Sequence, residues 1–301
     1  MRRSLPHSGI LVGVDGSPSS VAAVRWAAHE ATMRNSPLTL VHVVTAPPVL
    51  GAPVLVSPAA PIPAEFVEQR EEDARQMLND AIKVAEDSAA GHGSLKINAE
   101  VFVSAPAATL VEQSTDAEMV VVGSRGQSTW RRALLGSVSS ALVHHARCPV
   151  AVMPSELASL PQPMGSSVLV GVDGSPVSEL ATAIAFDEAS WRNADLVALH
   201  AWTDAEMGRV LTMESGELES AANRILAERL AGWQERYPDV TVHRLVVWDH
   251  PARHLLDRAR WAQLVVVGSH GRGGFTGMLL GSVSMAVVHA ARVPVIVARR
   301  R

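Results

Sequence analysis

The sequence predicts an α/β protein made of two tandem, doubly wound parallel sheets of five strands each. Three observations predict this class: a length of 301 residues, which suits two domains, an internal repeat, and short apolar runs that alternate with segments of helical periodicity. Hydrophobic residues make up 48% of the chain and charged residues 19%, a globular composition rather than a disordered one. Each half is long enough to bury a core of its own.

The internal repeat sets the domain organisation. The octapeptide Leu-Val-Gly-Val-Asp-Gly-Ser-Pro occurs at residues 11–18 and again at residues 169–176, an offset of 158. Later in each half, the segments at residues 120–126 and 134–139 recur at an offset of 145. The first half is therefore 13 residues longer, the difference of the two offsets. The proline-rich run at residues 47–63 is the expected place of this insertion, as a surface loop.

We assign residues 1–153 to the first domain and residues 167–301 to the second. Residues 154–166 contain prolines and a glycine without periodicity, so we expect a linker there. The single cysteine, Cys148, fits a buried, inert thiol in a reducing compartment. No apolar run exceeds strand length and no signal peptide is recognisable, so we expect a cytoplasmic protein without a membrane span. The formal net charge of −4 argues against a nucleic-acid partner.

The elements follow in a regular order. Residues 10–14 form an apolar run that ends in Asp-Gly, typical of a strand buried on both faces. Ser17 and Pro18 then predict a helix N-cap followed by proline in the first turn. The other expected elements of the first half are strands over residues 38–44, 99–103, 119–122 and 149–153, and helices over residues 65–89, 107–116 and 137–146. The second half repeats this order, which predicts βαβ units and a ligand site beyond the carboxyl ends of the strands.

Two strand ends in each half carry the candidate chemistry. The first strand ends in Asp15 or Asp173, and the fourth ends in a Gly-x-x-Gly pattern followed after nine residues by Gly-Ser. Glycines allow a loop to approach a ligand closely. A helix that opens at Gly-Ser presents unpaired N–H groups and the positive end of its dipole, to which serine hydroxyls add donors. The pattern therefore predicts a phosphate site in each half.

The role of the aspartates stays open between two alternatives. Asp15 and Asp173 are placed to accept hydrogen bonds from ribose hydroxyls or a base edge, or to help hold a phosphate-bound Mg²⁺. Three charge-assisted hydrogen bonds give about 4.5–9 kcal/mol, whereas association costs about 4–15 kcal/mol. A base must therefore be buried as well, and we expect it against the second strand near Val43 and Ala201. No Gly-Lys dipeptide occurs, so there is no Walker A loop.

These motifs resemble the universal stress protein family in the tandem-domain form found in actinobacteria. The resemblance covers about residues 9–298, and its most specific part is the Gly-x-x-Gly, nine residues, Gly-Ser pattern of the ATP-binding members. It implies a strand order of 3-2-1-4-5 in each half, an adenine nucleotide alpha hydrolase-like fold. It also implies pairing through the fifth strands, residues 150–153 against residues 295–298, either within one chain or in a homodimer.

The resemblance assigns ATP contacts to the first-strand glycine and aspartate, the residue after the second-strand histidine, the glycine loop and the Gly-Ser-Val-Ser turn. In the first half these are Gly13, Asp15, Val43, Gly123, Ser124, Arg125, Gly126, Gln127, Ser128, Thr129, Gly136, Ser137, Val138 and Ser139. In the second half they are Gly171, Asp173, Ala201, Gly268, Ser269, His270, Gly271, Arg272, Gly273, Gly274, Gly281, Ser282, Val283 and Ser284.

The two loops differ in composition. Trp130 stands in a first loop without the glycines that the second loop has at residues 273–274, which puts closure of the first loop in question. His270 replaces Arg125, so we expect phosphate affinity at the second site to weaken as rising pH removes the imidazole charge.

The expected function is a stress-response regulator whose output depends on ATP occupancy. The alternatives are a slow ATPase or nucleotidyl-transfer enzyme, a sensor of AMP or a cyclic nucleotide, and a structural module with vestigial pockets. With no evident general base or Walker lysine, we do not expect proficient catalysis.

Overall fold

The computed structural model describes residues 9–45, 64–91, 93–126, 135–155, 167–202, 215–272 and 279–299. The first half contains β1 (Ile10–Val14), α1 (Pro18–Met33), β2 (Leu38–Val44), α2 (Ala64–Ala89), β3 (Ile97–Val103), α3 (Pro106–Gln113), β4 (Met119–Gly123), α4 (Ser137–His145) and β5 (Val150–Met153). The second half contains β6 (Ser167–Gly171), α5 (Pro176–Trp191), β7 (Leu196–Trp202), α7 (Ser215–Arg236), β8 (Val242–Trp248), α8 (Pro251–Ala259), β9 (Ala262–Gly268), α9 (Ser282–Ala290) and β10 (Val295–Ala298). The insertion expected at residues 47–63 and all but two residues of the expected linker lie outside the described residues.

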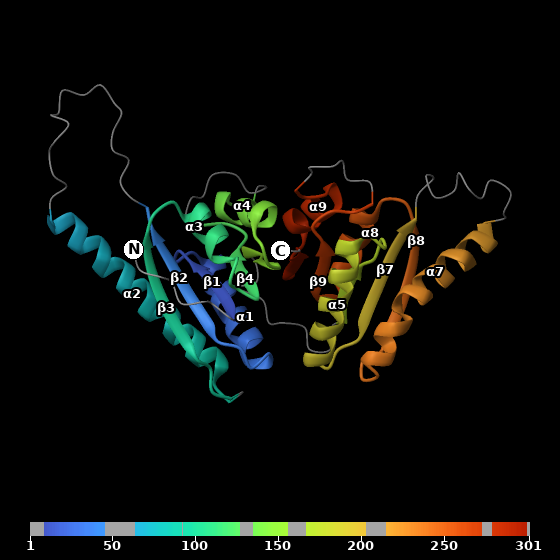
Figure 1. Cartoon of the computed structure of the whole chain (residues 1–301), viewed down its shortest axis with the longest axis horizontal. Helices are drawn as coiled ribbons and strands as arrows, with labels where there is room; N and C mark the ends of the chain where they lie inside the picture. The colour runs from blue at the N-terminus through green and yellow to red at the C-terminus, as the bar shows by residue number, and fades with distance from the viewer. Residues whose placement is uncertain are drawn as a thin grey trace, which may run out of the picture.

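The strands form one sheet of ten, in the order β3-β2-β1-β4-β5-β10-β9-β6-β7-β8. Each half has the 3-2-1-4-5 order and is parallel throughout, as predicted. The two halves are not separate sheets, because β5 and β10 pair antiparallel, with Val152 opposite Val295 and Val150 opposite Val297. The fifth strands therefore pair within one chain, and the two lobes of Figure 1 meet along this seam.

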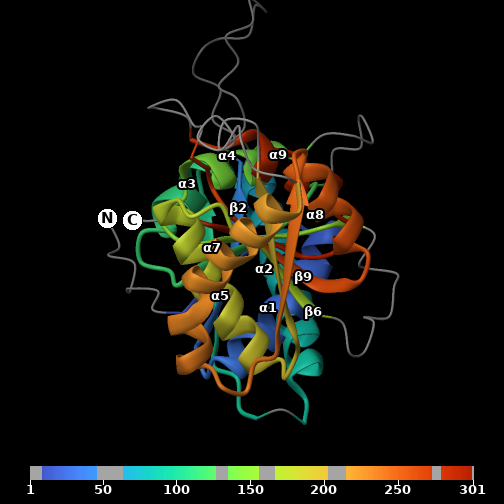
Figure 2. The same ribbon diagram turned by 90° about the vertical axis from the view of Figure 1, so that its right-hand side faces the viewer.

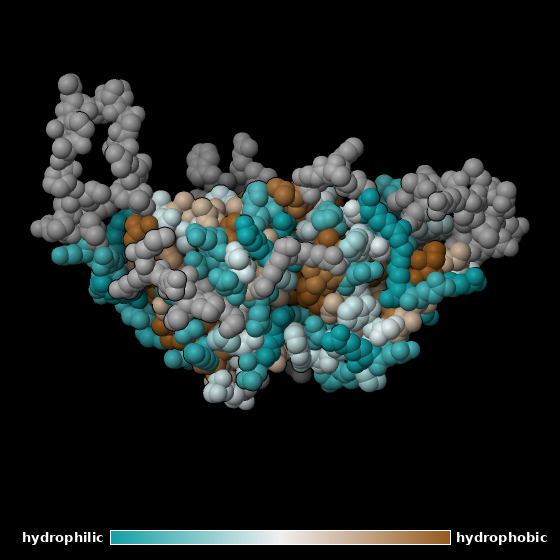
Figure 3. Space-filling view, viewed as in Figure 1, coloured by the Kyte–Doolittle hydropathy of each residue, from teal (hydrophilic) through white to brown (hydrophobic). Residues whose placement is uncertain are grey.

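Helices cover both faces of the sheet, and each face has its own hydrophobic core. The first core holds side chains of α1, α2, α5 and α7, among them Trp26, Leu78 and Phe186. The second holds side chains of α3, α4, α8 and α9, among them Leu110 and Leu142. Neighbouring residues of a strand enter opposite cores, which explains why the strands are continuous apolar runs. The outer surfaces of α2 and α7 are hydrophilic (Figure 3).

The helix starts follow the sequence expectations. The hydroxyl of Ser17 accepts a hydrogen bond from the backbone N–H of Ser20 at 3.2 Å, and Ser175 does the same for Ser178 at 3.2 Å. The ends differ by a few residues. The helix predicted over residues 107–116 ends at Gln113, because the hydroxyl of Ser114 bonds back to the carbonyl of Val111 at 2.6 Å. No helix within the described ranges has the length and apolar character that crossing a bilayer requires.

A ring of four charged side chains joins α1 to α5 across the seam. Glu30 and Glu188 are completely buried, and each bonds to both Arg34 and Arg192. The guanidinium of Arg34 also lies over the ring of Trp191, 4.6 Å from its centroid. Each acid and each arginine recurs at the offset of 158, so the ring has the symmetry of the repeat.

The two buried carboxyls of this ring titrate differently. Burial, together with the nearby charge of Glu30, raises the pKa of Glu188 to about 8. Burial also acts to raise the pKa of Glu30, but Arg192 and Arg34 outweigh it and hold that pKa below its usual value. The two carboxyls are therefore coupled, and at neutral pH the ring favours one proton held by the pair over two ionised carboxylates.

Candidate functional site

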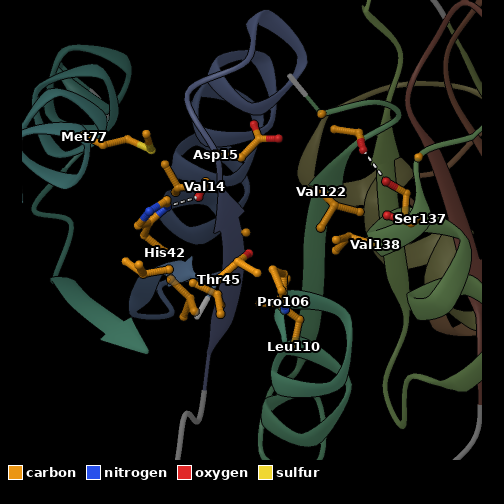
Figure 4. Close-up of a pocket in the computed structure, with 18 of the residues that line it drawn as sticks. Val14, Asp15, His42, Thr45, Met77, Pro106, Leu110, Val122, Ser137 and Val138 are labelled. Atoms are coloured by element: carbon orange, nitrogen blue, oxygen red, sulfur yellow. Dashed lines mark hydrogen bonds between the residues drawn. The ribbon is translucent and has the colours of Figure 1, made fainter. Parts of the chain in front are cut away.

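A cavity of about 540 Å³ opens at the carboxyl ends of β1, β2 and β4 in the first half (Figure 4). This is the point of the sheet where the strand order reverses, the usual ligand position in doubly wound folds. Ten of the predicted first-half residues line it: Gly13, Asp15, Val43, Gly123, Arg125, Gly126, Gly136, Ser137, Val138 and Ser139. Ser124 lies beside the cavity, with its hydroxyl 3.2 Å from that of Ser155. Gln127, Ser128 and Thr129, with Gly273 and Gly274 of the second half, lie outside the described residues.

Asp15 joins the end of β1 to the glycine loop. Its Oδ1 accepts a hydrogen bond from the backbone N–H of Ser17 at 3.0 Å. A Cβ atom added to Gly126 would lie 2.6 Å from Oδ2 of Asp15, so the loop backbone packs directly on the carboxylate. A side chain at this position would have to displace the carboxylate, so the second glycine of the pattern accommodates the protein's own aspartate as well as an approaching ligand.

The second half repeats this arrangement. The Oδ1 atom of Asp173 accepts from the N–H of Ser175 at 2.8 Å, and its Oδ2 accepts from the N–H of Arg272 at 3.2 Å. A Cβ on Gly271 would lie 2.5 Å from that Oδ2. The aspartate and the loop thus form one unit in both lobes.

The first glycine of the pattern serves helix packing. A Cβ on Gly123 would lie 2.7 Å from the carbonyl carbon of Ser19, in the first turn of α1. The hydroxyls of Ser17 and Ser19 both donate to the carbonyl oxygen of Arg125, which holds the loop against the start of α1. Gly123 therefore allows the end of β4 and the start of α1 to touch.

The two serines at the start of α4 have different tasks. We expected both hydroxyls to face a ligand, but the hydroxyl of Ser139 is buried and donates to the carbonyl oxygen of Gly123 at 2.6 Å. Ser284 does the same for Gly268 at 2.5 Å. Ser137 is exposed at the cavity wall (Figure 4). The expectation is thus wrong for the Ser139 hydroxyl, which fixes the loop to the helix.

The start of α4 has the properties of an anion site. Gly136 is the N-cap residue, and no side chain among the described residues caps this helix. The N–H of Gly136 bonds to the carbonyl of Ser124 at 2.8 Å, which brings the helix end under the loop. The first-turn N–H groups at residues 137–139 therefore remain for a ligand, with the positive end of the helix dipole behind them. In the second half, Gly281 is an equally uncapped start of α9 within the described chain.

The opposite side of the cavity carries apolar side chains, among them Val43 and Leu110, which suit a planar base. Nδ1 of His42 lies 2.7 Å from the carbonyl oxygen of Val14 (Figure 4). In the second half, Nδ1 of His200 lies 2.6 Å from the carbonyl oxygen of Val172, so each histidine links the first two strands of its lobe. The neighbouring residue Val43 is nearly buried against Leu110 in the second core.

The sequence analysis missed the contribution of α2 to this wall. Arg70, Asp73 and Met77 line the cavity, and Nη1 of Arg70 donates to the carbonyl of Thr45 at 2.7 Å. The signal was available, because these residues are spaced three and four apart and so share one face of a helix. No sequence pattern shows which face of a helix lies over a cavity.

The second half differs from the first around this common frame. His270 is exposed, and its Nδ1 lies 3.1 Å from the hydroxyl of Ser269. The guanidinium of Arg229 lies against Gly174, where an added Cβ would be 2.3 Å from the guanidinium carbon. The residue 145 positions before Arg229 is Val84, so α2 has no cation at the corresponding position.

Fold and site together define a tandem α/β protein with a glycine-lined site at the switch point of its sheet. The family model described as "Universal stress protein family" matches residues 8–154 and 164–299. The chain belongs to the universal stress protein family. It is 53% identical over 300 residues to universal stress protein Rv2005c of Mycobacterium tuberculosis, with 100% of each chain covered.

Two further relatives extend this comparison. Universal stress protein Rv2623 of Mycobacterium tuberculosis is 50% identical over 291 residues, which are 97% of this chain and 96% of the relative. The crystal structure of a universal stress protein from Archaeoglobus fulgidus DSM 4304 superposes with a TM-score of 0.71 at 20% identity, covering 99% of this chain and 100% of that one. The last similarity concerns the fold alone.

Proposed function

We propose that the chain binds ATP at two sites, one in each lobe, and acts as a stress-response regulator through their occupancy. The observation that carries this proposal is the uncapped start of α4 at Gly136, held under a glycine loop at the wall of a cavity. Unpaired helix N–H groups with the dipole behind them favour a phosphate group over a neutral one. The same uncapped start at Gly281 supports a second site.

The size and polarity of the first cavity support a nucleotide. Its volume of about 540 Å³ lies within the range of about 300–1,000 Å³ usual for small-molecule sites. One wall offers N–H groups and Ser137, and the other offers Val43, Leu110 and Met77. A ligand with a charged end and an aromatic end, such as ATP, fits both walls.

Mg²⁺ would accompany the phosphates rather than occupy a site of its own. Among the described residues, no group of three or more His, Cys, Asp or Glu side chains is arranged to hold a metal ion. Mg²⁺ usually binds through one or two carboxylates together with substrate phosphates. Asp15 lies against the loop at Gly126, although its Oδ1 accepts a hydrogen bond from Ser17.

Two measurements test this proposal. Mass spectrometry of the purified, denatured chain should identify adenine nucleotide, and calorimetric titration with ATP should give two sites per chain. Gly126→Ala and Gly271→Ala should each remove one site, because the added Cβ meets the aspartate. Gly232→Ala is the matched control, since nothing lies within 4 Å of its added Cβ.

The same samples separate the alternatives. Phosphate release during the titration would favour an ATPase, and displacement by AMP or a cyclic nucleotide at lower concentration would favour a different ligand. A wild-type chain that carries no nucleotide and binds none would contradict the proposal.

A further inference from the structure

One arginine connects the two lobes near both sites. Arg299 follows β10, and its guanidinium reaches the end of α4 in the other lobe. Nε donates to the carbonyl of Ala146 at 2.9 Å, and Nη2 donates to that of His144 at 2.5 Å. Nη1 donates both to the carbonyl of Val143 and to that of Leu279 at 3.0 Å. The donors of one side chain thus bind both lobes.

The contacts with α4 complete a helix end. The last carbonyls of an α-helix have no partner within the helix. Three carbonyls at the end of α4 receive their hydrogen bonds from Arg299, and a cation at this end also suits the helix dipole. The other end of this helix, nine residues long, is the phosphate cradle at Gly136 and Ser137.

The contact with Leu279 lies close to the start of α9, where the second candidate site is expected. Leu279 is two residues before Gly281, the N-cap of α9, whose N–H bonds to the carbonyl of Ser269 at 2.7 Å. Figures 1 and 2 both show α4 and α9 side by side at the same end of the molecule. Arg299 therefore joins the helix that opens the first site to the segment that leads into the second.

The link is one-sided. The residue 145 positions before Arg299 is Pro154, which has no side-chain donor. The first lobe therefore offers no equivalent cap from this position to the end of α9. A shift of Leu279 when a ligand binds at the start of α9 would pull on α4 through Arg299. Pro154, at the corresponding position, has no side-chain donor that could oppose it.

We propose that Arg299 is a positioning residue that couples the two nucleotide sites by tying Leu279, which leads into α9, to helix α4. This proposal rests on the proposed function, because it concerns ATP affinity at those sites. Coupling between sites is reciprocal, so occupancy of either site must change affinity at the other by one common factor. A rigid helix of about 1.5 Å per residue transmits a displacement at its end to its start.

The coupling is measured by titrating ATP into the full chain. The quantity is the ratio of the first-site Kd in Gly271→Ala to the first-site Kd in the chain with both sites intact. We expect this ratio to differ from one by about fivefold or more, the lower range of measured site coupling. In Arg299→Met, which keeps the side-chain length and removes the donors, the ratio should be one. Arg292→Met, at an exposed arginine of the same lobe, is the control and should keep the wild-type ratio.

Two further measurements keep the proposal falsifiable. Hydrogen exchange in the nucleotide-free chain should become faster at residues 144–146 and 280–282 in Arg299→Met, a readout of the link that requires no ligand. Arg299→Lys keeps the charge but cannot span four carbonyls, so the ratio of first-site Kd values should stay near one in this variant. A ratio equal to that of the wild-type chain would overturn the proposed role of the guanidinium in linking the lobes. ATP binding with a ratio of one in the wild-type chain would overturn the coupling alone, whereas no ATP binding would overturn the proposed function as well.

Discussion

The two lobes share the hydrogen bonds that hold the aspartate, the glycine loop and the following helix together, and they differ in the charged residues around them. The hydrogen bond from a serine N–H to Oδ1 of the first-strand aspartate is 3.0 Å long in the first lobe and 2.8 Å in the second. The hydrogen bond from the helix serine hydroxyl to the glycine carbonyl is 2.6 Å and 2.5 Å long. Around this frame, Arg125 corresponds to His270, and Pro154 corresponds to Arg299. The repeated motif thus fixes the geometry through its own hydrogen bonds, and the halves are free to diverge in charge.

The largest effect should come from breaking the symmetry of the ring across the seam. Glu30→Gln leaves Arg34 and Arg192 without their ionised partner, and breaking a buried ion pair costs about 3–5 kcal/mol. Glu188→Gln should cost less at pH 7, because burial raises the pKa of Glu188 to about 8, whereas the two arginines hold the pKa of Glu30 below its usual value. Denaturant unfolding of both variants compares them. Equal losses would show that the repeat-related acids are equivalent.

The same pair predicts a dependence of stability on pH. The pKa of Glu188 is raised to about 8 in the folded chain from 4.5. The folded state therefore binds the additional proton between these values, so its contribution to stability is complete below pH 4.5 and is lost as pH rises through 8. Thermal unfolding between pH 6 and 9 should show this loss in the wild type but not in Glu188→Gln. A parallel loss in Glu188→Gln would assign it to another group.

The shared frame is tested by the two serines that hold the loops. Ser139→Ala and Ser284→Ala should each destabilise the chain by about 1–3 kcal/mol, because a buried carbonyl loses its partner. The two losses should be similar, since the two bonds are equivalent. Ser137→Ala, at an exposed hydroxyl, is the control for stability. If Ser137→Ala lowered the melting temperature and Ser139→Ala did not, the structural role would belong to the hydroxyl of Ser137 rather than to that of Ser139.

The smallest effect concerns the residue that differs inside the loops. Between pH 5.5 and 8, ATP affinity at the second site should fall by up to about fivefold, since an exposed ion pair contributes about 0–1 kcal/mol. His270→Arg should remove this dependence, and the first site with Arg125 should not show it. Calorimetry in each single-site variant measures the difference. Constant affinity at the second site would mean that His270 does not contact the phosphates.

The sequence predicted what local patterns determine. The caps at Ser17 and Ser175 and the position of the cavity follow from turn chemistry and strand order. The ring was missed because Arg34 and Glu188 are 154 positions apart, and no local pattern marks their contact. Arg299 was missed for the same reason. At the N-terminal end of α4 the pattern gave the position of Ser139 but not the direction of its hydroxyl, which depends on the carbonyl of Gly123.

The antiparallel join between β5 and β10 also limits how two molecules can associate. Each of these strands has a neighbour on both sides, β4 and β10 for one and β9 and β5 for the other. Their main-chain donors and acceptors are thus shared with neighbours inside the chain, which leaves no free border there for a second molecule to extend. Within the ten-stranded sheet, the two edge strands that remain are β3 and β8, at its opposite ends. An oligomer of this chain would therefore have to form through the edge strands β3 and β8 or through its helices.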